Sequence, residues 1–381
     1  MGASDRPGAT TRPKLAVTFG DPDTWRTNRY GAAQRGCAFV GECVIGCNHG
    51  AKNSLDLTYL AAAESAGARA VTDAEVTRIE PRGGGYAVST TTPSDPSAAP
   101  RVWTAPRVVL AAGAVATTEL LLRARDVHRT LPRLSARLGH GFSGNGDFLS
   151  LAELRTPRGD LTTGPTITTN TVLDVPEGRR SVWFQVQDGA FPLALHELFD
   201  AVVPGQRARR WWRARTAPPP LRSVFAVLAM GHDSGDGRLR LTRSGRAKLA
   251  WRNQWQAHLY RSQQRVGPML ARLLNARPYR PLTWSLLRRT TTVHPLGGVR
   301  PGPDAATGVV DTAGEVAGAG VGERPVVDAG RAALAGVDDP GPVADGPVVG
   351  PLLGPPIRRA HPPDPDRFLA GGGAGGGADT G

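Results

Sequence analysis

The chain has 381 residues, 40% of them hydrophobic, which is enough for one large domain or two ordinary ones with packed cores. The net charge is +13, but nearly all of it comes from scattered arginines, so we expect no nucleic-acid partner. No run of about 18 uncharged apolar residues is present, and residues 1–20 lack the layout of a signal peptide. We therefore expect a cytoplasmic protein without a spanning helix.

Three cysteines lie close together at Cys37, Cys43 and Cys47. A cysteine at position 40 would complete an iron–sulfur spacing, but Val40 stands there and Asn48 follows the last cysteine. An iron–sulfur cluster remains an alternative. We favour buried thiols in a tight turn, with no bound metal.

The next elements are one helix and a small meander. Leu55–Ala66 has the apolar spacing of a helix, and Gly67 ends it. Glu75–Glu80 and Tyr86–Thr91 alternate as strands do, with glycines forming the turn between them. Val102-Trp103-Thr104 predicts a third strand.

The most informative stretch of the chain is a strand followed directly by a helix. Arg107–Ala114 is apolar, β-branched and ends in small residues, which is typical of a buried parallel strand. Val115–Arg123 continues as a helix. Because ligands in doubly wound sheets bind at the carboxyl ends of the strands, we expect a nucleotide-sized ligand beside Gly113.

From about residue 150 the pattern changes to that of a separate α+β domain. Thr166–Leu173 and Ser181–Val186 read as strands, and Arg238–Thr242 with Lys248–Trp251 reads as a hairpin. Gln254–Ala276 has the periodicity of a long amphipathic helix. Such a domain is suited to covering a substrate.

Arg207–Arg215 combines basic residues with Trp211 and Trp212. It is interpreted either as an interfacial anchor that makes weak contact with a membrane surface or as a solvated loop with its tryptophans packed on the domain.

Two glycine-containing motifs differ in meaning. Gly139, Gly141 and Gly144 match GxGxxG, but no βαβ unit surrounds them, so we predict a turn. His294 precedes Pro295, which favours an extended backbone at the histidine, and a glycine pair follows. A histidine held on a rigid turn suits proton transfer, because its pKa lies near working pH.

Four segments together resemble the glucose–methanol–choline (GMC) flavoprotein oxidoreductases, and within them the cholesterol oxidase-like branch. These segments are Cys37–Pro81, Arg107–Arg123, Phe142–Leu149 and Thr292–Gly298. The resemblance implies FAD as cofactor and His294 as the base that takes the alcohol proton. The residues that it places beside the cofactor are Val76 at the adenine, Ala112, Gly113 and Ala114 at the ribose and pyrophosphate, and Asn145 and Gly146 at the flavin pocket.

The resemblance also implies an α/β fold with two parts. The first is an incomplete doubly wound FAD-binding domain, whose first βαβ unit with GxGxxG is absent; the second is an α+β substrate domain with an antiparallel sheet. We expect the FAD-binding part over 1–149, the substrate domain over 150–290 and a return to the first domain over 291–316. Residues 317–381 are of low complexity and are expected to be disordered.

The sequence thus predicts an FAD-dependent oxidoreductase that acts on the CH–OH group of a small-molecule alcohol, with sterols among the substrates considered. The alternative is a catalytically inactive remnant of such an enzyme. It would lack the pyrophosphate loop and the active-site asparagine, for which Gly336–Pro340 offers no match.

Overall fold

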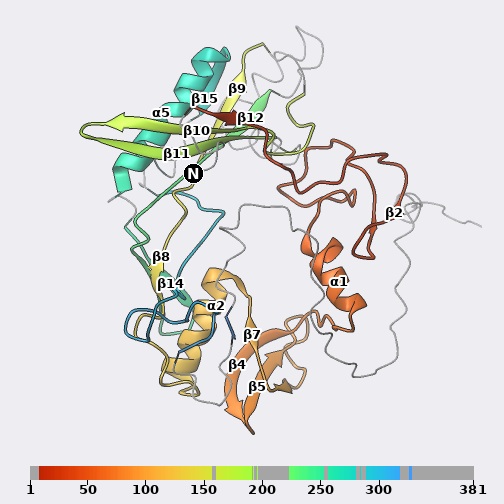
Figure 1. Cartoon of the computed structure of the whole chain (residues 1–381), viewed down its shortest axis with the longest axis vertical. Helices are drawn as coiled ribbons and strands as arrows, with labels where there is room; N and C mark the ends of the chain where they lie inside the picture. Colours follow the sequence, from red (N-terminus) through yellow and green to blue (C-terminus); the bar gives the residue numbers. More distant parts are fainter. Residues whose placement is uncertain are drawn as a thin grey trace, which may run out of the picture.

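The computed structural model describes residues 8–156, 160–190, 192, 195, 223–252, 256–279, 284, 289–317 and 326–327. Two bodies follow one another along the long axis, and loops from the N-terminal part lie beside them (Figure 1). We call them the six-stranded body and the small-sheet body.

The six-stranded body is one antiparallel sheet with a long helix, α5 (Ala257–Leu273), packed against it. The strand order is β1-β10-β11-β12-β9-β15. The strands are β1 (Thr10–Thr11), β9 (Phe148–Leu154), β10 (Asn170–Glu177), β11 (Arg180–Gly189), β12 (Val224–Gly231) and β15 (Ala276–Tyr279). The prediction of an antiparallel α+β unit in this part of the chain is confirmed.

Alternation along the strands gives this body its core. Phe148, Phe184 and Val227 point from the sheet toward Leu259 and Tyr260 of α5, and Trp284 joins the same cluster. The rings of Tyr260 and Trp284 lie 5.1 Å apart. Burial of such aromatic residues contributes most of the packing energy of a small core, and it fixes α5 on one face of the sheet.

The small-sheet body contains three short sheets around helix α2 (Gly113–Leu122), which continues into a π-helical turn, η3 (Arg123–Val127). One sheet is the predicted meander, β4 (Glu75–Arg82), β5 (Gly85–Thr91) and β6 (Arg101–Ala105). Another is β14-β13-β8, made of β8 (His140–Phe142), β13 (Gly237–Leu241) and β14 (Ala247–Ala250). The third pairs β7 (Val109–Leu110) with β16 (Val326–Val327).

The predicted buried strand before α2 is only partly observed. β7 is parallel to β16, as expected for this type of strand, but it contains two residues. Leu110 is buried, whereas Val109 is 62% exposed. The burial predicted for this strand is therefore wrong at Val109, because within the described residues β7 has a single neighbouring strand.

The N-terminal part is mainly loop, with one strand pair, β2 (Arg26–Thr27) and β3 (Ala33–Gln34). The predicted helix 55–66 forms as a 3₁₀ turn, η2 (Leu55–Leu57), followed by α1 (Tyr59–Ser65). The thiols are free, and only Cys37 is fully buried, so burial of all three is not observed.

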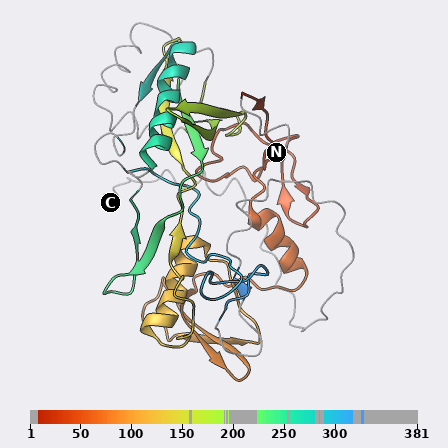
Figure 2. The ribbon, with the colours of Figure 1, turned by 60° about the vertical axis from the view of Figure 1, so that its left-hand side comes forward.

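The predicted hairpin forms, but it packs in the small-sheet body. β13 and β14 pair antiparallel, and β13 also pairs with β8. The Ala247 amide donates to the Glu119 carboxylate of α2 over 2.6 Å. Figure 2 shows the hairpin beside β8 and away from the six-stranded sheet. Residues between 150 and 290 thus contribute to both bodies, as does β1, which joins the six-stranded sheet from the N-terminal side.

Two sequence predictions concern segments that the structure does not describe. Arg207–Arg215 lies wholly outside the described residues. Of the predicted tail 317–381, the described residues are 317 and the two of β16. None of the helices in the described part of the chain combines the length and apolar content that crossing a bilayer requires.

Candidate active site

A buried carboxylate, Asp147, stands at the centre of the candidate site, immediately before β9. Its side chain is 0% exposed. Oδ2 accepts the main-chain N–H of Val293 at 2.8 Å and that of His294 at 3.1 Å. A carboxylate withdrawn from water needs such donors to remain charged. Asp147 therefore joins the start of β9 to the segment that carries the histidine.

The imidazole of His294 also contacts this carboxylate. Nδ1 lies 3.0 Å from Asp147 Oδ2 and 3.2 Å from Oδ1, while the side chain as a whole is 42% exposed. The hydrogen bond to Asp147 is the main cause that raises the pKa of His294 above its ordinary value, and partial burial opposes it. One ring edge is thus bound to the protein and the other is open.

The loop Gly144-Asn145-Gly146 presents Asp147 to the histidine. Asp233 accepts the amides of Gly144 at 2.8 Å and Gly146 at 3.3 Å. Asn145 has a left-handed backbone, with φ +55°, and its amide lies 3.4 Å from Asp147 Oδ1. Asn145 and Gly146 therefore lie on the loop that carries Asp147, the carboxylate bonded to His294.

Gly146 is tightly enclosed, which explains why glycine stands there. A Cβ at this position would come within 2.5 Å of the Gly231 carbonyl oxygen and 2.9 Å of Leu259. Its own carbonyl accepts the Gln263 side-chain amide of α5 at 2.8 Å. The loop is thus fixed from both β12 and α5.

The glycine pair after His294 brings the two motifs of the sequence together. Gly297 has φ +85°, and a Cβ on it would come within 1.9 Å of the Gly141 carbonyl oxygen. A Cβ on Gly298 would come within 2.2 Å of Thr118 Oγ1, on α2. The GxGxxG-like segment therefore contains strand β8, with Gly139 in the turn before it, so the turn predicted for this segment is only partly observed.

The other predicted cofactor residues form a second group around α2. Ala112 and Gly113 are exposed at the start of this helix, whose N-cap has no side-chain hydrogen bond. Gly113 has φ +79°, and a Cβ there would meet no atom within 4 Å. Ala114 is linked to the His294 segment, because its carbonyl accepts the Thr118 hydroxyl at 2.6 Å and Thr118 contacts Gly298.

Val76 lies in β4 and packs against the core of the small-sheet body. β4 is an edge strand of its sheet, so one side of its main chain faces no other strand of that sheet. The ladder with β5 is irregular between Val76 and Arg78. Val76 thus packs against the same core cluster as Leu121 and Leu122 of α2. The Asp147 loop contributes no residue to that cluster.

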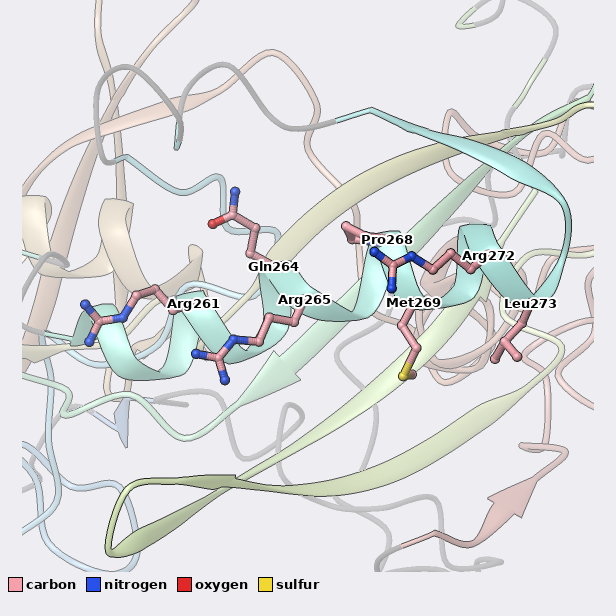
Figure 3. Close-up of a pocket in the computed structure, with 7 residues that line it drawn as sticks. All are labelled: Arg261, Gln264, Arg265, Pro268, Met269, Arg272 and Leu273. Carbon is pink, nitrogen blue, oxygen red and sulfur yellow. The ribbon is translucent and has the colours of Figure 1, made fainter.

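A groove on α5 lies outside this site (Figure 3). Arg261, Arg265, Met269 and Arg272 line it. Within the described residues, Arg265 bonds Glu177 at 2.9 Å. The opposite side of α5 carries Leu259 and Gln263, which face the Asp147 loop, so helix α5 separates the groove from His294.

Comparison with known proteins identifies the family that part of the chain matches. Residues 24–126 match the family model described as GMC oxidoreductase. Residues 24–126 belong to the GMC oxidoreductase family. Beyond this region the chain is similar to proteins named cholesterol oxidase, at 31–32% identity.

The relatives differ in how much of the chain their alignments cover. Cholesterol oxidases from two strains of Mycobacterium tuberculosis are 32% identical over 304 residues, which is 74% of this chain and 52% of theirs. A cholesterol oxidase of Acinetobacter baumannii is 31% identical over 163 residues, which is 39% of this chain and 29% of its own. The chain thus spans about half the length of the Mycobacterium relatives.

Sequence reasoning missed three residues that build the site: Asp147, Asp233 and Gln263. Asp147 stands in the segment Phe142–Leu149, and a lone acidic residue just before an apolar strand was the available signal. Asp233 and Gln263 act over separations of 87 and 117 residues from Gly146, which no local pattern reveals.

Proposed function

We propose that this chain forms part of an FAD-dependent oxidoreductase that acts on the CH–OH group of a small-molecule alcohol, with His294 as the base. The observation that carries the proposal is the pairing of His294 with a fully buried carboxylate while one ring edge stays open. A base must reach the proton that it abstracts and must be held in one orientation. Family membership supports the oxidoreductase class.

His294 would take the hydroxyl proton of the alcohol at its open ring edge. Proton removal pushes electron density toward the carbon and so favours departure of its hydride. The raised pKa makes the neutral form a stronger base, and it also keeps the ring protonated up to a higher pH. The rate should therefore rise with pH and reach a plateau above the pKa of His294.

The start of α2 fits part of a nucleotide cofactor. The N-cap residue makes no side-chain cap, although the Ala112 amide donates to Thr117 Oγ1 at 3.1 Å. No acidic residue stands in the first turn, and the space above Gly113 is open. Such a helix start suits a phosphate group. Ala112, Gly113 and Ala114 would thus approach the ribose and pyrophosphate, and edge strand β4 would offer Val76 main-chain groups to adenine. FAD, when bound, supplies the hydride acceptor.

The two bodies would divide the work. The small-sheet body would hold the cofactor, and the six-stranded body would cover the alcohol, with Asn145 and Gly146 lining the flavin pocket at their junction. Sterols are the first substrates to test, because the matched relatives are named cholesterol oxidases. The Arg207–Arg215 segment, which the structure does not describe, stays a proposal for weak membrane contact.

The test is the visible spectrum of the purified chain reconstituted with FAD, followed by anaerobic addition of a sterol or a simpler alcohol. We expect a protein-bound flavin band that bleaches. In His294→Ala the bleaching rate should fall by roughly 10²–10⁴-fold, the usual contribution of a general base. His258→Gln, an exposed histidine on α5, is the matched control and should bleach as the wild type does.

A second candidate, a catalytically inactive remnant, is favoured by one observation: the exposure of Val109 in the two-residue strand β7. The same experiment separates the two. A folded protein that stays colourless after reconstitution, or that binds flavin that never bleaches, would support the remnant. Unchanged bleaching in His294→Ala would count against His294 as the base.

A further inference from the structure

We propose that Asp147 is a positioning residue that holds the proton of His294 on Nδ1, so that Nε2 is the ring atom through which His294 exchanges protons. Its meaning for catalysis rests on the proposed function above. The protonation pattern itself does not, because it follows from contacts within the chain.

The direction of the Nδ1 hydrogen bond follows from the chemistry of its partner. A carboxylate accepts hydrogen bonds and donates none, so Nδ1 must carry the proton when it lies 3.0 Å from Asp147 Oδ2. In a neutral imidazole only one nitrogen is protonated. Nε2 of neutral His294 is therefore left with its lone pair, ready to accept a proton.

Asp147 cannot turn away from the ring without breaking other contacts. The same Oδ2 atom accepts the amides of Val293 and His294, so the carboxylate is held by the main chain that carries the imidazole. Its side chain is fully buried. The carboxylate and the histidine thus form one rigid unit. They differ in this from a surface ion pair, whose two side chains move independently.

Nε2 points away from this unit. Within the part of the chain that the structure describes, the imidazole makes its hydrogen bonds through Nδ1, and the side chain is 42% exposed. Asp147 is also the charged group that shifts the pKa of His294. Asp233 and Asp236, on the segment after β12, act instead on Tyr260 of α5, whose pKa burial raises.

The competing interpretation is that Asp147 only fastens the loop and that the imidazole contact is incidental. Asp233 provides the comparison, because it is another carboxylate that fastens the same loop, through Gly144 and Gly146, without a contact to His294. A purely structural role predicts similar effects of Asp147→Asn and Asp233→Asn on the imidazole. A positioning role predicts an effect of Asp147→Asn alone.

The experiment is ¹⁵N NMR of protein labelled at histidine, recorded across pH without FAD or alcohol. His294→Gln identifies the signals among the eight histidines. In the wild type at high pH we expect Nδ1 protonated and Nε2 unprotonated. Asp147→Asn should lose this preference and move the pKa of His294 down toward its ordinary 6.5, whereas Asp233→Asn should keep both.

Three results would overturn the proposal: an Nε2-protonated wild type, an Asp147→Asn variant with unchanged tautomer and pKa, or equal effects of both substitutions. If Asp147→Asn does not fold, as judged by its amide spectrum, the wild-type tautomer still decides. Failure of flavin binding or bleaching would remove the proposed function but leave this tautomer result standing, so the two failures are distinguishable.

Discussion

At the scale of single residues, the pairing of His294 with Asp147 couples the chemistry of the site to its stability. The carboxylate raises the pKa of the imidazole, so the folded chain binds this proton more tightly than the unfolded chain does. Two other histidines behave in the opposite way, because burial lowers the pKa of His128 and of His140. Protonation thus favours folding at one position and opposes it at two.

The pH dependence of unfolding should reveal this coupling as a difference between wild type and His294→Gln. The stabilisation from protonated His294 is fully present below the ordinary pKa of 6.5 and is lost as pH rises through the raised, folded value. The wild type should therefore gain stability relative to the variant as pH falls from about 9 to about 5.

Urea unfolding at several pH values measures the difference, in which the contributions of His128 and His140 cancel. Hydrogen bonds lower the pKa values of Asp21, Asp95 and Asp304, so these carboxyl groups titrate below the pH range of 5 to 9. A difference that is constant with pH, or that grows as pH rises, would contradict the assignment.

The residues of the site were predictable to the extent that they stood in local motifs. His294, Asn145 and Gly146 were named from their motifs and lie together in the structure. Asp147 was not named, although it is two residues from Asn145. Its importance comes from burial and from donors 146 and 147 residues away, neither of which a local pattern contains.

At the scale of elements, periodicity predicted where helices and strands occur better than where they end or what they touch. The long helix was expected to reach Ala276, but α5 ends at Leu273 and Asn275 turns the chain with φ +51° into β15. The hairpin β13–β14 was predicted, yet its place beside α2 depends on the Glu119 contact with Ala247, which spans 128 residues. Such placement is decided by tertiary packing.

The contact of Gly298 with α2 should be a sensitive joint between the His294 segment and the small-sheet body. Gly298→Ala adds a Cβ that would lie 2.2 Å from Thr118 Oγ1, at a backbone φ of +84°. Strain at such a backbone alone costs on the order of 1–3 kcal/mol, and the clash adds to it. We expect a loss of unfolding free energy above that range in urea.

Gly178→Ala is the matched control for this substitution. Gly178 also has a positive φ, +65°, in the turn between β10 and β11, but a Cβ there would meet no atom within 4 Å. Gly178→Ala should therefore lower the unfolding free energy only by the strain of the positive φ, without a clash. Equal losses for the two variants would mean that the contact with Thr118 carries no weight.

At the scale of the whole molecule, the described chain leaves much apolar surface uncovered. Between residues 19 and 45 the side chains of Phe19, Trp25, Phe39, Val44 and Ile45 are all exposed. The rings of Phe19 and Phe39 lie 6.1 Å apart, so part of this surface is continuous. Contiguous exposed apolar surface indicates a place where another molecule, another chain or a ligand is bound.

The isolated chain should therefore self-associate through this N-terminal surface. Val44 and Ile45 form an adjacent pair that is 64% and 51% exposed, and Leu273 with Leu274 at the end of α5 forms a comparable pair at 75% and 50%. Val44→Asp with Ile45→Asp should lower the weight-average mass measured by light scattering across a concentration series, because charge opposes burial of the surface. Leu273→Asp with Leu274→Asp, which changes hydrophobicity comparably but elsewhere, should leave the mass nearly as in the wild type.

The opposite ranking of the two double variants would assign self-association to α5 and its basic groove. A wild type that is monomeric at every concentration would show that the N-terminal surface does not bind a second copy.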